Sequence, residues 1–274
     1  MTAETRTIFA LLSVLPVRGP RDLDRRTIGR AMAFAPLVGL VLGVITALVV
    51  LGFRLFTKVP DPTPQNLLPA VIGIATLALL TRGLHLDGLA DVADGFGAGQ
   101  DRALTAMRDS RIGAFGALAL VFVVLVQVAA LSLAISEHRG TVSIVVAAMT
   151  GRLAATLACA SRAPAAHPDG LGALVAGSVR PRHAVLSVLG VAVVAAVAGR
   201  LDIDGGDTSR AVRAVLAVAA GTAAGWLLRR YLIRYLGGIT GDVLGALVEV
   251  ATSVTLVFMS LNVPYGVKHR LGLI

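Results

Sequence analysis

The sequence predicts an all-α, polytopic integral membrane protein with about seven transmembrane helices. Of its 274 residues, 56% are hydrophobic and only 15% are charged, and the mean hydropathy is +0.82. A soluble protein usually carries about 25% charged residues, so one soluble core could not bury this much apolar surface. Long apolar runs recur between charged loops, and we see no polar stretch long enough to fold alone. We therefore predict one membrane-embedded domain over residues 1–274.

Each predicted span is an apolar run that approaches the roughly 20 residues needed to cross a bilayer. The runs are Ala31–Phe53, Leu67–Leu80, Ala114–Ile135, Thr141–Ser161, Ala184–Gly199, Ala214–Leu228 and Val243–Leu261. The second run is short, and it could extend into the polar motif that follows it. The fifth and sixth runs are short as well. Alanine, glycine and valine dominate them, and such small residues let helices approach closely in lipid.

The basic residues indicate the topology. The formal net charge is +9 and the pI is about 11.1. No basic stripe interleaved with aromatic residues is present, so we expect membrane lipid as a partner and no nucleic acid. If the N-terminus is cytoplasmic, the loops on that side hold about twice as many arginines and lysines as the others. We therefore predict a multi-pass protein of the inner (cytoplasmic) membrane whose N-terminus lies inside.

This topology places three polar segments on the cytoplasmic side, where they can converge on one site: Arg82–Gly113, Arg162–His183 and Arg229–Asp242. The acidic loop Leu201–Asp207 falls on the other side. It lacks the glutamate that a calcium loop places near its end, so we interpret it as a solvated turn. The single cysteine, Cys159, excludes an internal disulfide and is expected to be a buried apolar residue.

The chemistry concentrates in the motif HLDGLADVADG, His85–Gly95. On a helix, Asp87, Asp91 and Asp94 fall within roughly 60° on one face. Like charges beside a membrane repel and are costly to desolvate, and a divalent cation such as Mg²⁺ would neutralise them. If these aspartates were only part of a solvated helix face, lysines would be expected among them, and the motif contains none. His85 lies about 160° from Asp87 on such a helix. Its role stays open: it could support one of the metal ligands, act as a general base, or simply stand at the start of the helix.

A second motif, RALTAMRDSRIGAFG, spans Arg102–Gly116. Asp109 offers a fourth carboxylate for metal. Arg108 and Arg111 carry guanidinium groups whose geometry suits phosphate oxygens, and Ser110 is a hydroxyl among these charges. Carboxylates that hold metal beside arginines that bind phosphate are typical of phosphoryl transfer.

Two further patches have functional potential. The glycine-rich segment Leu236–Leu247 holds Thr240 and Asp242 at a predicted helix start. Such a turn can present backbone N–H groups to an anion, and Asp242 can cap the helix or bind metal. Arg152 and Glu249 lie inside apolar runs, where charged residues usually have partners and functions. They could pair with each other or reach the site.

At these residues the chain resembles the cobalamin synthase (adenosylcobinamide-GDP ribazoletransferase) family. The resemblance covers most of the chain, and its long paired central motifs are specific. The stretches that carry it are LSVLPV at Leu12–Val17, APLVGLVLG at Ala35–Gly43, HLDGLADVADG, MRDSRIGAFG, HPDGLGA at His167–Ala173 and GGITGDVLGAL. The chain departs mildly from the family pattern, with Arg108 in place of lysine and Ala114 in place of threonine.

The resemblance implies the final assembly step of cobalamin biosynthesis. A hydroxyl of α-ribazole, or of its 5′-phosphate, attacks adenosylcobinamide-GDP beside the cobinamide arm, and GMP departs, with Mg²⁺ as cofactor. A site aspartate or His85 would accept the hydroxyl proton. The resemblance leaves open which base the ribazole carries, dimethylbenzimidazole or another. It also leaves open whether the protein forms a homo-oligomer or associates with other enzymes of the pathway. The implied metal ligands are Asp87, Asp91, Asp94 and Asp109, and the implied substrate-binding residues are Arg108, Ser110, Arg111, Arg152, Thr240 and Asp242.

Two other functions compete with this interpretation. A CDP-alcohol phosphatidyltransferase also uses aspartates on membrane helices, but its DGxxAR motif and the GxxxDxxxD half that follows are not matched by DGLAD at Asp87–Asp91. The nucleotide released, GMP or CMP, separates the two enzymes.

A transporter often shows paired internal repeats, and we find no second copy of the aspartate motif. Uptake into proteoliposomes without conversion of the substrate would favour a transporter.

Overall fold

A computed structural model describes residues 2–19, 24–56, 66–160 and 164–261. These residues form helices and no named strand, which confirms the predicted all-α class. Six helices are long and apolar enough to span a membrane: α3 (Ala35–Phe56), α7 (Ala114–Ser136), α8 (Gly140–Ala160), α10 (Pro181–Arg200), α11 (Thr208–Leu236) and α12 (Gly241–Ser260). The fold is therefore that of a multi-pass membrane protein, as predicted.

A seventh span is formed only if two shorter helices count as one. α4 (Leu67–Leu80) and α5 (Leu84–Ala98) pass the same test together but are bent by 89°. At the elbow, Arg82 and Gly83 adopt left-handed backbone angles, with φ of 55° and 69°. The predicted continuation of the short run into the aspartate motif therefore exists, but the chain turns sharply at the join.

Five shorter helical segments complete the described secondary structure. They are α1 (Ala3–Leu12), α2 (Arg25–Ala33), the 3₁₀ turn η1 (Gln100–Arg102), α6 (Ala103–Ala106) and α9 (Gly170–Val175). The predicted span Ala31–Phe53 therefore begins in the last residues of α2 and continues in α3, which starts two residues after α2 ends. The predicted span Ala214–Leu228 is extended at both ends in α11. Ser161, the last residue of a third predicted span, lies outside the described residues.

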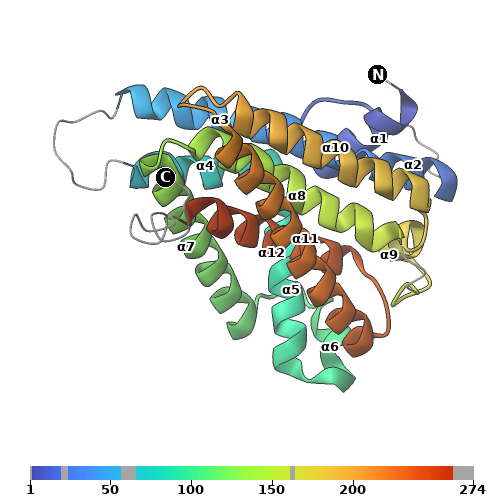
Figure 1. Cartoon of the computed structure of the whole chain (residues 1–274). Coiled ribbons are helices and arrows are strands. Elements are labelled where there is room, and N and C mark those ends of the chain that lie inside the picture. Colours follow the sequence, from blue (N-terminus) through green and yellow to red (C-terminus); the bar gives the residue numbers. More distant parts are fainter. Residues whose placement is uncertain (1, 20–23, 57–65, 161–163, 262–274) are drawn as a thin grey trace, which may run out of the picture.

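The central helix of the bundle is α8, which packs against α3, α7, α10, α11 and α12. In Figure 1, α3, α8 and α10 run side by side, α11 descends across α8 and α10, and α5 and α7 descend below them. Of the 18-residue apolar window of α8, 94% is buried. Cys159 is fully buried there, as expected. By contrast α7 exposes large apolar side chains such as Phe122 and Leu125, which suits contact with lipid.

Small residues allow α8 and α3 to approach closely. A Cβ atom added to Gly39 of α3 would lie 2.4 Å from the carbonyl oxygen of Ala148, and one added to Gly43 would lie 2.8 Å from the Cα of Val145. Backbone atoms cannot rotate away as a side chain can. The glycines are therefore required by the packing of these two helices.

The two ends of the bundle are chemically different. At one end Arg54 pairs with Asp204 at 3.0 Å and Arg210 pairs with Asp202 at 2.8 Å. The acidic loop Leu201–Asp207 is thus an ion-paired cap and not only the solvated turn that the sequence predicted. Asp202 is buried because Arg210 neutralises it. The described parts of the three polar segments meet at the opposite end.

We expect Gly39→Ala to destabilise the protein, because its new methyl group collides with the backbone of α8. Overpacking of this kind costs about 1–3 kcal/mol, and the fixed backbone favours the upper end of that range. The measurement is the thermal unfolding midpoint in detergent. Gly52→Ala on the same helix is the control, since nothing lies within 4 Å of its Cβ position. Equal midpoints for the two variants would contradict the close packing of α3 and α8.

Candidate active site

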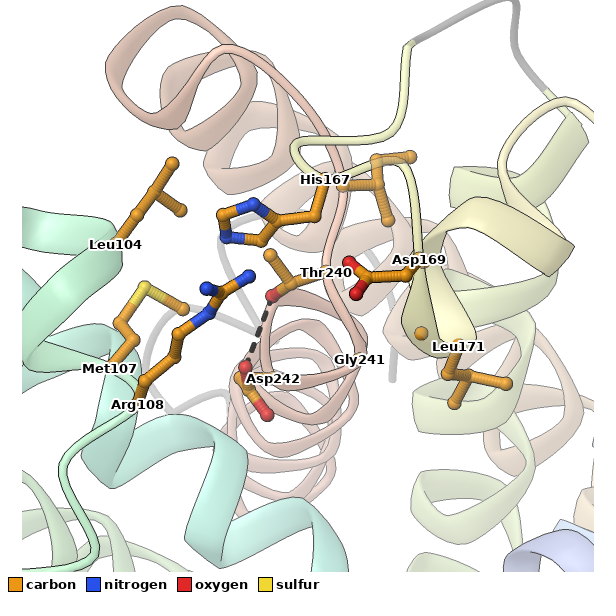
Figure 2. A pocket seen from close by; sticks show the side chains of 12 residues that line it. Leu104, Met107, Arg108, His167, Asp169, Leu171, Thr240, Gly241 and Asp242 are labelled. Carbon is orange, nitrogen blue, oxygen red and sulfur yellow. Dashed lines mark hydrogen bonds between the residues drawn. The ribbon is translucent and has the colours of Figure 1, made fainter.

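A cavity of about 460 Å³ opens where α6 and the turn after it, α9 and the start of α12 meet. Figure 2 shows the Arg108 side chain pointing into it, between Asp242 and Thr240 on one side and His167 on the other. Each of the three polar segments that were predicted to converge contributes lining residues. They are Leu104, Met107 and Arg108 from the first, His167 and Asp169–Gly172 from the second, and Ile239–Asp242 from the third.

Two loops form one wall of this cavity and hold each other in place. The N–H of Ala166 donates to the carbonyl of Ile239 at 3.1 Å, and the N–H of Ile239 donates to the carbonyl of Pro164 at 2.9 Å. A Cβ atom at Gly238 would lie 2.4 Å from the nitrogen of Ala166, and one at Gly172 would lie 2.3 Å from the oxygen of Ile239. The glycine-rich sequence before α12 thus serves close contact between the loops.

The start of α12 presents a helix N-terminus to the cavity. Thr240 caps the helix, because its hydroxyl accepts the N–H of Val243 at 3.1 Å. The same hydroxyl lies 3.3 Å from Oδ2 of Asp242. The first backbone N–H groups of a helix and the positive end of its dipole favour an anion. The predicted helix start at Thr240 and Asp242 is therefore part of the cavity.

Close packing of α5 on α12 brings the carboxylates together. A Cβ atom at Gly88 would lie 2.8 Å from both the Cα and the carbonyl oxygen of Asp242. As a result Asp91 lies within electrostatic reach of Asp242, Asp87 and Asp94, all of the same charge. Asp87, Asp91 and Asp242 form no salt bridge with any described residue. We call these three residues the carboxylate cluster.

Asp94 has a different environment from the other aspartates of its motif. Its carboxylate accepts the N–H of Gly113 at 2.7 Å and the N–H of Gly116 at 2.8 Å. These groups belong to the N-terminus of α7, where a negative charge is stabilised. Cβ atoms at the two glycines would lie 2.4 Å and 2.3 Å from the carboxylate oxygens. Asp94 therefore anchors the SRIGAFG end of the second motif onto the aspartate motif.

The candidate site residues of the second motif divide into two groups. Arg108 enters the cavity, but Asp109, Ser110 and Arg111 form an exposed turn beside it. Arg111 and Asp109 pair with each other at 3.0 Å, and the Arg111 side chain is 87% exposed. Hydrogen bonds from the Arg111 side chain and backbone N–H hold the pKa of Asp109 below its ordinary value. The structure does not bring Asp109, Ser110 or Arg111 into the cavity.

Arg152 and Glu249 lie in the interior of the bundle, outside the cavity. Arg152 is only 2% exposed and donates to the carbonyl of Ala148 at 3.3 Å. It is electrostatically coupled to Glu249, whose carboxylate accepts a hydrogen bond from Gln127 at 2.7 Å. Gln127 also donates to Ser253 at 3.0 Å. Of the two alternatives, the structure favours mutual attraction of the two charges over a place in the cavity.

Sequence reasoning assigned no role to His167 or Asp169, although both line the cavity. The stretch HPDGLGA was noted only as part of the family resemblance. A usable signal was present, because this segment was expected on the same side of the membrane as the aspartate motif. A polar histidine and aspartate beside glycines in such a loop are candidates for ligand contact.

The fold and this cavity together define a membrane-embedded protein with a polar ligand site at one end of its helical bundle. The chain belongs to the cobalamin-5-phosphate synthase family, whose sequence model matches residues 4–260. It is 60% identical over 277 residues to an adenosylcobinamide-GDP ribazoletransferase of Frankia casuarinae, with 100% of both chains covered.

Two more distant relatives carry the same name. That of Syntrophobacter fumaroxidans is 40% identical over 249 residues, covering 90% of this chain and 92% of its own. That of a Nocardioides species is 36% identical over 253 residues, covering 92% and 95%. No solved structure matches the chain.

The two half-buried aspartates of α5 should respond differently to neutralisation. Asp94→Asn removes charge-assisted hydrogen bonds, worth roughly 1.5–3 kcal/mol each, from the start of α7. We expect a clearly lower thermal unfolding midpoint in detergent. Asp91→Asn removes like-charge repulsion, so its midpoint should be unchanged or higher, while turnover is lost. If Asp94→Asn unfolded at the wild-type temperature, its anchoring role would be refuted.

Proposed function

We propose that this protein joins adenosylcobinamide-GDP to α-ribazole, or to α-ribazole 5′-phosphate, and releases GMP. The observation that carries the proposal is the cavity in which Arg108 meets the N-terminus of α12 and Asp242, the member of the carboxylate cluster that lines it. The full-length identity of 60% to a ribazoletransferase supports the same reaction. Among the enzymes considered, a CDP-alcohol phosphatidyltransferase has no comparable support.

The reaction sets clear requirements on the site. A ribose hydroxyl forms a new bond to the phosphorus next to the cobinamide arm, and the bond from that phosphorus to the bridging oxygen breaks. The electron pair stays with GMP, and the hydroxyl loses its proton. A pyrophosphate repels an attacking oxygen, so cationic groups must neutralise its charge before the attack.

Arg108 and the start of α12 supply positive charge from the protein itself. The guanidinium of Arg108 points into the cavity (Figure 2), and its planar donors match phosphate oxygens. Across the cavity, the first turn of α12 offers backbone N–H groups and a helix dipole to the same anion. We assign Arg108, Thr240 and the first turn of α12 to binding of the GDP moiety.

The carboxylate cluster fits a magnesium ion in its chemistry. It consists of oxygen donors without a cationic partner among the described residues, and Mg²⁺ usually needs only one or two carboxylates beside water and phosphate oxygens. In the described parts of the chain, no three acidic, histidine or cysteine side chains are placed to hold a metal ion together, so most of the ligands of the ion would have to be water and phosphate oxygens. One or two of Asp87, Asp91 and Asp242 would hold the ion, which would neutralise pyrophosphate charge.

A carboxylate of the same cluster is the natural acceptor for the proton of the attacking hydroxyl. Asp91 is half-buried on α5, within electrostatic reach of Asp87 and Asp242. The proton therefore has an acceptor at the place where α5 and α12 meet, and the base need not come from a distant loop.

We place the active site on the cytoplasmic side of the inner membrane. The site end of the bundle carries the loops with the excess of arginine, and the exposed apolar faces of α3, α7 and α10 contact lipid. This orientation gives the site access to the nucleotide-activated substrate from the cytoplasm.

The purified protein in liposomes should convert adenosylcobinamide-GDP and α-ribazole to equal amounts of cobalamin and GMP, measured by chromatography. Removal of Mg²⁺ with a chelator should abolish turnover. Arg108→Met should lower kcat/KM about 10- to 100-fold, as expected for loss of a charge-assisted hydrogen bond to phosphate.

Arg111→Met is the matched control, because this arginine pairs with Asp109 on the surface. Its kcat/KM should stay within about twofold of the wild type. Release of CMP from a CDP-alcohol instead of GMP, or uptake of a substrate without conversion, would refute the proposed function. A larger loss in Arg111→Met than in Arg108→Met would refute the assigned phosphate contact.

A further inference from the structure

A second cavity, of about 240 Å³, lies beside the first and shares Leu171, Gly241 and Asp242 with it. Its walls come from α1, α2, α5, α8 and α12 as well as α9. Most of the residues that line it are apolar, among them Leu12, Met32, Ala155, Leu244 and Val248. The polar side chains that line it are His85, Asp87 and Asp242. The same end of the bundle therefore has one polar and one largely apolar compartment.

His85 is the unusual group in the apolar cavity. Its side chain is 4% exposed, and its Nδ1 atom is buried without a hydrogen-bond partner among the described residues. Buried polar atoms in native proteins are nearly always hydrogen-bonded. A ligand in the cavity that offers one complementary polar atom would satisfy this nitrogen.

The size and polarity of the cavity restrict its occupant. An apolar cavity of about 150 Å³ is enough to bind benzene, so a cavity of 240 Å³ has room for a larger, bicyclic aromatic ring. A ring with one nitrogen at its edge matches apolar walls with a single unsatisfied imidazole. A lipid acyl chain would fill the same walls but would leave the His85 nitrogen without a partner.

We propose that this cavity binds the azole base of the ribazole substrate, with His85 hydrogen-bonded to a ring nitrogen. The proposal rests on the proposed function. With the base in the apolar cavity, the ribose lies at Asp242, which lines both cavities, and its hydroxyl faces the phosphates in the polar one. His85 is then a binding residue for the acceptor, and α1 and α2 form part of the acceptor site.

Acceptors that differ only in the size of the base test this assignment. We would measure kcat/KM for α-ribosides of imidazole, benzimidazole and dimethylbenzimidazole with the wild type and with Ala155→Leu, which fills the cavity. We expect a loss of about tenfold or more for the two bicyclic acceptors and a much smaller loss for imidazole. The KM for adenosylcobinamide-GDP should stay within about twofold. Ala129→Leu, on an exposed face of α7, is the matched control and should change neither value.

Substitution of His85 tests the polar contact. His85→Phe keeps a ring of similar size but cannot hydrogen-bond, and we expect the KM for the riboside to rise about tenfold with the KM for the nucleotide substrate unchanged. His85→Asn retains a donor and acceptor and should recover part of the affinity. Thermal unfolding midpoints of both variants show whether the fold is intact.

The outcomes separate the two proposals. If the wild type releases no GMP, the proposed function fails. If it turns over, but Ala155→Leu affects all three acceptors equally or raises the KM for the nucleotide substrate instead, the base site is overturned and the function stands. An acyl chain that copurifies with the wild type and is lost in Ala155→Leu, while the acceptor kinetics stay unchanged, overturns it as well.

Discussion

The close approach of α5 to α12 is the contact on which the site depends. Gly88 rests on the backbone of Asp242, and Gly245 rests on the backbone of His85, with Cβ positions only 2.8 Å and 3.1 Å from those atoms. Any side chain at Gly88 would separate the helices and with them the carboxylates they carry. This contact opposes electrostatics, because it brings Asp91 near Asp242 and Asp87. Packing of the glycine faces holds together charges that would otherwise move apart.

Such an arrangement is costly unless another interaction supports the geometry. The Asp94 carboxylate provides one support, since it binds the N–H groups at the start of α7 and ties α5 to a second spanning helix. The α1 segment provides another, because the N–H of Val14 donates to the carbonyl of Leu80 at the elbow between α4 and α5. The aspartate helix is thus held at both ends and along one face. A site that crowds like charges until a cation and an anionic substrate arrive needs this kind of rigid support.

Hydropathy and spacing predicted much of this structure, and their failures have physical reasons. The spans follow from apolar length, and the shared face of Asp87 and Asp91 follows from helical periodicity. The 89° elbow was not predictable from hydropathy, because it depends on two left-handed backbone positions. The different environments of Arg108 and Arg111 could not be predicted either, since both occur in one turn and only tertiary packing decides which side chain enters the cavity. Likewise, periodicity cannot distinguish Asp94, which anchors α7, from its neighbours on the same face.

The buried polar group formed by Gln127, Arg152 and Glu249 connects the spanning helices to this frame. Each residue comes from a different helix, α7, α8 and α12 respectively. Charged and amide groups in a membrane interior are stable only when they face one another, so their contacts restrict how each helix can rotate about its axis. Glu249 lies two turns after Asp242 on α12, and α7 begins at the glycines that bind Asp94. A rotation that separated Glu249 from Gln127 would also turn Asp242 away from α5. The polar interior of the bundle therefore sets the orientation of the helices that form the active site.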